Sequence, residues 1–430
     1  MNKKIKNIAN TKILLKNGKV MNVLNGKSII QDILIENEKI VEIGKVQNND
    51  NYITIDCNKK IVTQAFIDTH AHFKTPGVGD QETFISGSNA ALSGGYSKVC
   101  IMPDTNPILD TPELIELILN KSSNLPVNIH PIGAVTKQIN GLDMAELGSM
   151  INSGAVAISD ANNAIMNSQV ARYAIEYAKM FDVPFINHPE NIDLVNEGSM
   201  NESITSNALG LSGNPTIAES VMIYRDLEIA QYVKGKIHIP NITCSESIDL
   251  IDSYRNKGTN VTCAVSPQHL FFKDSDLETY DSNLKISPPL RGKKDIQSLI
   301  KGLKDGAIDC VASSHSPNRF DDKDKDFYHA EAGVISLETA FAATYTVLSE
   351  NNFSMNSILN LFSLNPSKIM NLELCDINIG STAELVVIDP NKKWVVTDQD
   401  IYSKSHNTPF LNKELKGKVE FTINKNFLFG

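Results

Sequence analysis

The stretch FIDTHAHF (residues 66–73) places two histidines two positions apart, behind an apolar run and an aspartate. In a β-strand, residues i and i+2 lie on the same face, so His70 and His72 should point the same way at the end of a strand. Two buried imidazoles side by side need partners, and such a pair commonly binds a metal ion. The stretch therefore predicts a metal site, for which the rest of the chain must supply further ligands.

The middle of the chain, residues 66–379, alternates short apolar strands with helical segments, such as AVAISD followed by SQVARYAIEYAKMF. One of these helices should start at Thr111 and Pro112, an N-cap side chain followed by a proline at the first helical position. Roughly eight strand–helix units predict a (β/α)8 TIM-type barrel. A doubly wound open sheet is the alternative, but no GxGxxG or GxxxxGK(S/T) motif follows a predicted strand to support it.

The two ends of the chain, residues 1–65 and 380–430, have a different pattern. Short alternating segments separated by Asn, Gly and Lys turns predict β-strands at both ends. We expect the two ends to pair into one small β-sandwich-like domain beside the barrel. The predicted fold class is therefore α/β, with a barrel inserted between the two parts of a small β domain.

The composition indicates a globular protein, with 41% hydrophobic and 21% charged residues. The formal net charge of −10 argues against general nucleic-acid binding, which needs a basic surface. Six scattered cysteines form no CxxC pair and predict reduced thiols rather than disulfides or a cysteine zinc site. The sequence shows no signal peptide and no membrane-length apolar run, so we expect a cytoplasmic protein that does not contact a membrane.

Polar residues gather at the predicted strand ends, where barrel enzymes place their chemistry. These residues are His70, His72, Asp160, His188, Asn241, Ser314 and His315. Three histidines and one aspartate would suffice for one zinc ion, which lowers the pKa of bound water to about 7 and makes a hydroxide that attacks amide carbonyls. For Asp160 the alternative is a carboxylate that caps the following helix.

Nearly the whole chain resembles the dihydroorotases of the amidohydrolase superfamily. The matching segments are collinear with that family, and they are FIDTHAHFKTPG (66–77), ALSGGYSKVCIMPDTNPILDTPE (91–113), GAVAISDANN (154–163), PFINHPEN (184–191), VTCAVSPQHLFF (261–272), ISPPLRGKKD (286–295), GAIDCVASSHSP (306–317), SLETAF (336–341) and SHNTPFLNKELKGKV (405–419). The resemblance implies a metal-dependent barrel with a small β domain built from both termini. It also implies the interconversion of carbamoyl aspartate and dihydroorotate in pyrimidine synthesis.

The resemblance implies a metal-ligand set that is only partly present. The paired first-strand ligands of the family match His70 and His72, its bridging carboxylate matches Asp160, and a further histidine ligand matches His188. Asn241 stands where the family has another histidine ligand. Ser314 stands where the family has an aspartate that binds metal and moves the proton, so serine would be the altered catalytic residue.

The substrate contacts implied by the resemblance are altered as well. Lys74 replaces an arginine, which keeps the charge but loses the two-pronged grip on a carboxylate. Asp104 and Ser287 each replace an asparagine, and Asn318 replaces a histidine. Asparagine is a poor zinc ligand beside imidazole, so one zinc ion is expected rather than two.

Three hypotheses follow. In the first, the chain is a dihydroorotase-type cyclic amidohydrolase with a reduced site. In the second, it is a non-catalytic relative that assembles with aspartate transcarbamoylase. In the third, it is an amidohydrolase with a different small-molecule substrate, in which Asp104 or another carboxylate acts as the base. Analogy with similar barrels predicts a homodimer.

Overall fold

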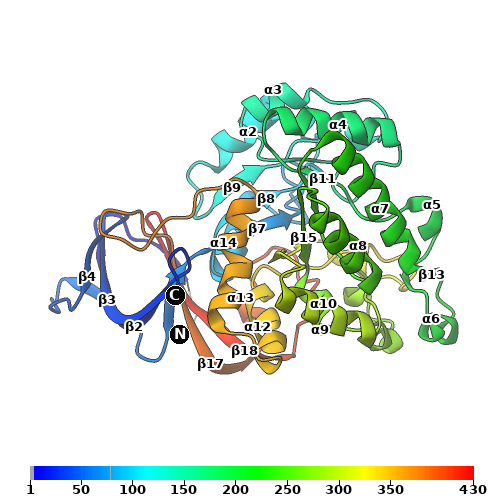
Figure 1. Cartoon of the computed structure of the whole chain (residues 1–430). Helices are drawn as coiled ribbons and strands as arrows, with labels where there is room; N and C mark the ends of the chain where they lie inside the picture. Colours follow the sequence, from blue (N-terminus) through cyan, green and yellow to red (C-terminus); the bar gives the residue numbers. More distant parts are fainter. Residues whose placement is uncertain (1–3, 78) are drawn as a thin grey trace.

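The computed structural model describes residues 4–77 and 79–430. Among these residues, eight short parallel strands stand at the centre of the larger part of the molecule (Figure 1). They are β7 (Phe66–Ala71), β8 (Tyr96–Ile101), β9 (Asn128–Pro131), β10 (Ile158–Ser159), β11 (Phe185–Ile186), β14 (Ile237–Ile239), β15 (Val261–Val265) and β16 (Cys310–Val311).

The eight strands close into a ring. Strands β7, β8 and β9 pair in parallel, and so do β10, β11, β14, β15 and β16. The two groups are joined by parallel bridges between Gly133 and Ile158 and between Ala71 and His315. This order closes β16 onto β7 and confirms the predicted (β/α)8 barrel.

Helices surround the strands. The helices of the described residues are α1 (Phe84–Ser93), α2 (Pro112–Ser122), α3 (Leu147–Asn152), α4 (Ser168–Met180), α5 (Ile192–Val195), α6 (Ile204–Leu209), α7 (Thr216–Val233), α8 (Ser245–Asn256), α9 (Pro267–Phe271), α10 (Lys293–Asp305), α11 (Phe320–Lys323), α12 (Ala340–Glu350), α13 (Met355–Phe362) and α14 (Leu364–Ile369). Four 3₁₀ turns span Lys137–Ile139, Asp274–Thr279, Ser282–Leu284 and Asp398–Asp400. Helix α2 begins at Pro112 as predicted, although the side chain of Thr111 makes no capping hydrogen bond.

The barrel strands are apolar because both of their faces are covered. Every residue of β7 and β8 is buried, as expected of parallel strands packed between a filled interior and surrounding helices. Helix α4, in contrast, is apolar along one face only. Val170, Ala174 and Ala178 recur every four residues and are buried against the core. Between β11 and β14 the chain makes an excursion that contains α5, α6 and the short strands β12 (Met200–Asn201) and β13 (Gly213–Asn214).

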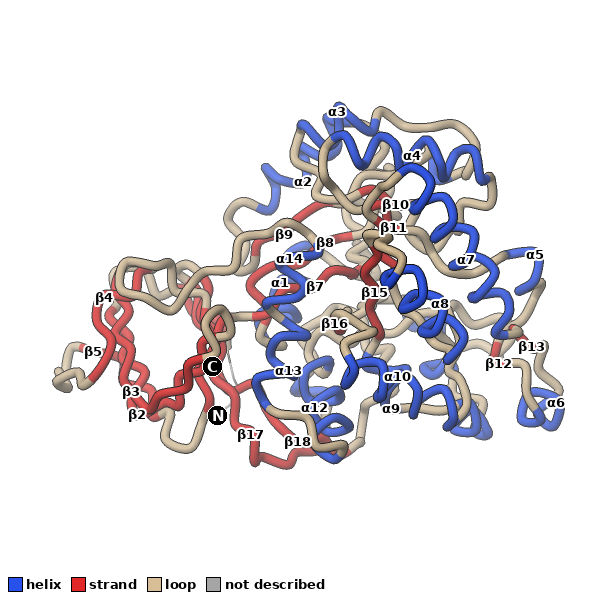
Figure 2. The backbone as a smooth tube through the Cα atoms, viewed as in Figure 1, coloured by secondary structure: helices blue, strands red, loops and turns tan. Residues whose placement is uncertain are grey.

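Strands from both ends of the chain form a second sheet, at the left of Figure 2. Its nine described strands are β1 (Ile5–Asn7), β2 (Lys12–Asn22), β3 (Lys27–Glu36), β4 (Lys39–Gly44), β5 (Tyr52–Asp56), β6 (Ile61–Gln64), β17 (Leu385–Val395), β18 (Glu414–Asn424) and β19 (Phe427–Phe429). The order is β1-β19-β18-β17-β6-β2-β3-β4, with β5 beside β2. Side chains from both chain ends, including Ile13, Ile33 and Leu385, share one apolar cluster inside this sheet.

A buried ion pair joins the small sheet to the barrel. Lys98 of β8 contacts Glu384, the residue before β17, and their side chains are 7% and 9% exposed. Asn424 of β18 donates to the carbonyls of Ser97 and Pro126 over 3.3 and 2.7 Å. These polar contacts fix how the small sheet meets the barrel.

Two further expectations concern cysteines and membranes. The six cysteines are free thiols, and five of them are buried. None of the helices within the described ranges is long and apolar enough to cross a bilayer.

Candidate active site at the strand ends

A small pocket, with a cavity volume of about 30 Å³, opens beside the carboxyl ends of the barrel strands. Five residues singled out in the sequence line this pocket: His70, His72, Asn241, Ser287 and Ser314. Further lining residues that sequence reasoning did not select include Asn162, Ser266, Gln268 and His269. The structure therefore brings together residues that lie more than two hundred positions apart in the sequence, from His70 to Ser314.

The paired histidines are connected to a carboxylate. His70 Nε2 and His72 Nε2 lie 3.0 Å apart, and His72 Nδ1 lies 2.8 Å from Asp104 Oδ2. Both contacts are hydrogen bonds when each neutral imidazole carries one proton, so that His72 Nδ1–H donates to Asp104 and His70 Nε2–H donates to His72 Nε2. His70 Nδ1 is buried and has no hydrogen-bond partner among the described residues. The result is a row of three groups running from Asp104 through His72 to His70.

Burial and neighbouring charges set the ionisation of this row. Burial, together with the nearby His72, His188 and His238, holds the pKa of His70 well below its ordinary value. Burial acts to raise the pKa of Asp104, but the charge and hydrogen bond of His72, with Lys74, bring it below its ordinary value. The structure thus favours a neutral His70 and an ionised Asp104.

The two altered ligand positions contact each other. Ser314 Oγ donates to Asn241 Oδ1 over 2.6 Å, so each polar group is satisfied by the other. Asn241 and Ser314 have φ values of 52° and 53°, in the left-handed region. Lys74 and Ala161, which also follow barrel strands, have φ values of 51° and 54°. Strained backbone of this kind clusters at functional sites, and here it occurs after four different strands.

Asp160 faces a neighbouring loop. Its Oδ1 accepts hydrogen bonds of 2.9 Å from the backbone N–H groups of Val135 and Thr136, and its Oδ2 accepts the Thr136 hydroxyl. Burial raises the pKa of Asp160, and these hydrogen bonds limit the rise. The carboxylate therefore anchors the loop after β9, because buried backbone donors need acceptors; it neither contacts His70 or His72 nor caps the following helix, whose N-cap is Asn167.

His188 belongs to a second buried network. Its Nε2 lies 2.7 Å from Glu190 Oε2 and 3.2 Å from Ser287 Oγ. Glu190 also accepts hydrogen bonds from Ser287 and Asn214, over 2.6 Å each. Burial acts to raise the pKa of Glu190, but the contacts with His188, Ser287 and Asn214 lower it to about 2.

These partners decide whether a zinc site fits. The 3.0 Å separation of the two Nε2 atoms is compatible with ligands that share one ion, because zinc–nitrogen distances are about 2.0 to 2.1 Å. However, no group of three or more His, Cys, Asp and Glu side chains in the described part of the chain is arranged to hold a metal. Asp160 and His188 make their hydrogen bonds to Thr136 and Glu190 rather than to the pair, although His188 lies near enough to His70 to help lower its pKa. The residues present therefore do not fit a zinc site of three or four protein ligands.

Two of the predicted substrate contacts, Lys74 and Asn318, contact each other. Lys74 Nζ donates to Asn318 Oδ1 over 3.2 Å, and Asn318 Nδ2 donates to the carbonyls of Ala332 and Gly333. Lys74 and Asp104 also line a second cavity of about 270 Å³. Lys74 therefore stands beside the Asp104–His72–His70 row and has an amide partner.

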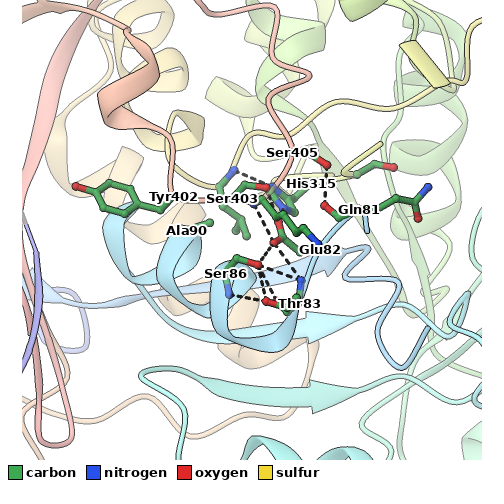
Figure 3. Close-up of polar contacts among 12 residues, drawn as sticks. Gln81, Glu82, Thr83, Ser86, Ala90, His315, Tyr402, Ser403 and Ser405 are labelled. Carbon is green, nitrogen blue, oxygen red and sulfur yellow. Dashed lines mark hydrogen bonds and ion pairs between the residues drawn. The ribbon is translucent and has the colours of Figure 1, made fainter. Parts of the chain in front are cut away.

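A buried cluster behind the pocket holds the strand ends in place (Figure 3). Glu82 lies 3.4 Å from His315 Nε2, and both side chains are fully buried. Glu82 also accepts hydrogen bonds from Ser86, Ser403 and the backbone N–H of Lys404. The carbonyl of His315 accepts the N–H of His72 over 2.7 Å. Glu82 thereby connects the C-terminal segment to the strand that carries the paired histidines.

Proteins of a known family are similar in sequence to this chain over almost its entire length. A model for dihydro-orotase-like proteins matches residues 59–247. The dihydroorotase of Ruminiclostridium cellulolyticum is 38% identical over 415 residues, which cover 96% of this chain and 97% of the relative. The chain belongs to the dihydroorotase family. The dihydroorotase of Caldicellulosiruptor saccharolyticus is also 38% identical over 415 residues, with 96% of each chain covered.

Solved structures agree with the fold of this dihydroorotase-family protein. The L-hydantoinase (dihydropyrimidinase) of Arthrobacter aurescens superposes with a TM-score of 0.83 at 20% identity, covering 96% of both chains. The dihydropyrimidinase of Brevibacillus agri gives a TM-score of 0.82 at 21% identity, covering 97% of this chain and 94% of the other. At these identities the likeness concerns the fold alone.

Proposed function

We propose that this dihydroorotase-family chain is a cyclic amidohydrolase that interconverts carbamoyl aspartate and dihydroorotate. The observation that carries the proposal is the 38% identity to proteins named dihydroorotase over 96% of the chain. His70 and His72 line a pocket at the strand ends, where barrel enzymes place their chemistry.

The row of Asp104, His72 and His70 would accept a proton. In ring opening, water adds to the ring carbonyl of dihydroorotate, one water proton leaves, and the ring C–N bond breaks as the nitrogen is protonated. His72, oriented by Asp104 over 2.8 Å, would take and return that proton at its Nε2, where the attacking water replaces the contact with His70. Asp104 would thus fix the orientation of the imidazole, which is the role that a carboxylate has behind a catalytic histidine.

Lys74 would bind the substrate carboxylate. Its ammonium group contacts an amide oxygen of Asn318 rather than a carboxylate, so an anionic substrate can replace that weaker partner. Ser287, which lines the pocket, has a hydroxyl that is already bound to Glu190. We therefore assign substrate binding mainly to Lys74, with Asn318 beside it.

The test combines turnover with metal content. We expect the purified chain to hydrolyse dihydroorotate and to contain less than one zinc per chain, since zinc needs three or four ligands and the paired histidines supply two. Absence of turnover in both directions, with and without added zinc, would overturn the proposal. Turnover of another cyclic amide, but not of dihydroorotate, would support an amidohydrolase with a different substrate.

One observation favours a second candidate function, that of a non-catalytic partner of aspartate transcarbamoylase. The side chains of Asp160, Asn241 and Ser314 are each satisfied by other protein groups, as expected of a site that no longer binds metal. A chain without turnover that co-purifies with aspartate transcarbamoylase would support this candidate. Turnover of dihydroorotate by the isolated chain would rule out this second candidate function.

A further inference from the structure

A third cavity, of about 580 Å³, is built from segments that lie far apart in the sequence. Its walls come from Asp80, the turn at Ser282 and Asn283, the segment 318–324 that follows β16, and residues 404–407. Ligand pockets in proteins commonly measure about 300 to 1,000 Å³, so a small organic molecule fits this space. We name it the Lys323 cavity, after the buried lysine in its wall.

Lys323 is a buried cation without a carboxylate partner. Its side chain is 6% exposed, and its ammonium group donates to the backbone carbonyls of Glu331 and Gly333 over 2.7 and 3.2 Å. The carboxylates of Asp281 and Glu331 act on it from a distance, but no carboxylate of the described residues forms an ion pair with it. A buried charge is costly unless it is paired, so the position lacks an anion.

Three neighbouring lysines also contact only neutral oxygens among the described residues. Lys404, in the same cavity wall, and Lys285 each donate to a backbone carbonyl, over 2.6 and 2.7 Å, and Lys74 donates to the amide of Asn318. The positive charges of Lys285 and Lys74 act on Lys323. The chain has 50 acidic and only 40 basic residues, so four lysines without a carboxylate partner in one region indicate an anion site.

The other charged groups of the wall leave the position of Lys323 without a counter-charge. These groups are Arg319, Asp80, Asp324 and His406. Arg319 is already held by Asp322, over 2.9 and 3.0 Å, and the side chain of His406 is 60% exposed. Asp80 and Asp324 line the cavity but form no ion pair with Lys323 or Lys404.

Lys323 can turn toward a ligand at little cost, because the carbonyl of Gly333 has more donors than it needs. It accepts from Asn318 Nδ2, Lys323 Nζ and Asn407 Nδ2, over 3.3, 3.2 and 3.0 Å. A carbonyl oxygen has two lone pairs, so the two amides still satisfy it once the lysine moves. Glu331 is exposed, so water can replace the lysine at its carbonyl.

An aromatic ring stands in the same wall. Phe320 lines the cavity and is 78% exposed. A planar ring can stack on such a side chain in an offset or edge-to-face arrangement. The amides of Asn283 and Asn407 in the wall supply hydrogen-bonding groups. The cavity therefore combines a cation for an acidic group with an apolar face for a ring.

We propose that the Lys323 cavity binds a small organic anion. Its carboxylate or phosphate group pairs with Lys323 and Lys404, and its ring packs against Phe320. The Lys323 cavity shares no lining residue with the pocket of His70 and His72, and the proposal does not rest on the proposed reaction. Because Gly333 lines that pocket and accepts from Lys323, a bound anion acts on one wall of the catalytic site.

Titration calorimetry with four probes tests the class of ligand. Benzoate and acetate carry a carboxylate with and without a ring, and phenyl phosphate and inorganic phosphate make the same comparison for phosphate. We expect each ring compound to bind at least tenfold more tightly than its ringless counterpart, and the tighter of the two ring compounds identifies the acidic group. No binding of any probe at millimolar concentration, or equal affinities within both pairs, would overturn the proposal.

Substitutions place the anion in the cavity. Lys323→Met and Lys404→Met should each weaken binding of the ring compounds at least tenfold, because each removes a positive charge from the site. Lys393→Met removes an exposed lysine on β17 and should leave binding unchanged. Circular dichroism and thermal unfolding should show that the variants are folded. Lys404 is exposed, so its variant decides the matter if Lys323→Met does not fold.

Proton uptake identifies the buried lysine itself. Burial and the charges of Lys285 and Lys74, opposed by Asp281 and Glu331, lower the pKa of Lys323 to about 7, so its side chain is mostly neutral at pH 8. A bound anion favours the charged form. Benzoate keeps its own charge at this pH, so calorimetry in two buffers of different ionisation enthalpy should show uptake of nearly one proton per benzoate. Lys323→Met should show none.

The same measurements separate this cavity from the catalytic pocket. Unchanged affinity in both Lys323→Met and Lys404→Met, or binding without proton uptake, would overturn the proposal. Binding that is lost in Lys74→Met but kept in Lys323→Met would also overturn it, and would assign the anion to the catalytic pocket. Because no turnover is measured, an inactive chain that still binds benzoate through Lys323 would support the cavity and count only against the proposed function.

Discussion

Ser314 Oγ donates to Asn241 Oδ1 over 2.6 Å, which joins the residues that follow β16 and β14 at the pocket. Both positions have left-handed backbone, and the family resemblance predicts a metal-binding side chain at each. Here the two shorter polar groups satisfy each other. The side chains at these two positions therefore bond each other rather than leaving free donor atoms for an ion.

Restoring ligands at these two positions should create a zinc site. In the Asn241→His/Ser314→Asp double variant, an imidazole and a carboxylate join His70 and His72 at the same pocket, giving the four ligands that zinc prefers. We expect the zinc content to rise from below one ion to about one per chain, measured by elemental analysis after dialysis. Asn163→Asp adds a carboxylate at a residue that bonds the Ile139 carbonyl outside the pocket and should leave the content unchanged. An unchanged zinc content in the double variant would contradict this interpretation.

Removing a member of the proton-accepting row should strongly lower turnover. Loss of a positioned acid–base group costs about 10²- to 10⁴-fold in rate, so His72→Asn and Asp104→Asn should each lower kcat for dihydroorotate within that range. Asp110→Asn changes a carboxylate that bonds Gln138 outside the pocket and serves as the control. If His72→Asn retained wild-type kcat, the assigned proton acceptor would be wrong.

The buried Glu82–His315 pair should contribute strongly to stability. Because removal of one partner leaves the other buried and unpaired, Glu82→Gln should lower the free energy of unfolding by about 3 kcal/mol at pH 7. Urea denaturation measures the change. Glu42→Gln alters an exposed glutamate and should change stability little; equal effects of the two substitutions would refute the assigned role.

The same glutamate predicts a pH dependence. Burial acts to raise the pKa of Glu82, but contacts with His315, Ser403 and Ser86 bring it below its ordinary value of 4.5. A lowered folded-state pKa gives stability that is present above the unfolded value and is lost as pH falls through the folded value. Unfolding free energy should therefore decline below pH 4.5, and the decline should be shallower in Glu82→Gln.

The Lys98–Glu384 pair should behave as a coupled unit. Lys98→Met or Glu384→Leu alone should cost about 3 to 5 kcal/mol, because each leaves one buried charge unpaired. The double variant should cost clearly less than the sum of the two. Additive effects in this double-mutant cycle, measured by denaturant unfolding, would show that the pair is not coupled.

The barrel could be predicted from the sequence because its strands are buried on both faces. A segment such as VTCAV (261–265) is apolar without alternation, and this pattern is typical of parallel strands. The strand-end positions of His70, His72, Asn241 and Ser314 followed from the same pattern. The excursion with α5, α6, β12 and β13 was not predicted, since its elements are only two to six residues long.

The partners of the site residues could not be predicted, because they depend on distant contacts. Asp160 bonds Thr136, which lies 24 residues earlier, and Asp104 bonds His72, which lies 32 residues earlier. Alternating polarity shows which residues are buried, but not which neighbour a carboxylate faces. Glu190 and Glu82 were missed for this reason; the nearest signal was the acidic residue two positions after His188 in the HPEN segment.

The small sheet also has a consequence for biosynthesis on the ribosome. Strand β6 pairs with β17, and β1 pairs with β19, although the whole barrel is translated between these partners. Until β17 emerges, β6 keeps an open edge on one side, and such edges invite pairing with other nascent chains. The sheet must therefore be completed after the barrel has been synthesised, so a premature stop after α14 would leave its N-terminal half prone to aggregation.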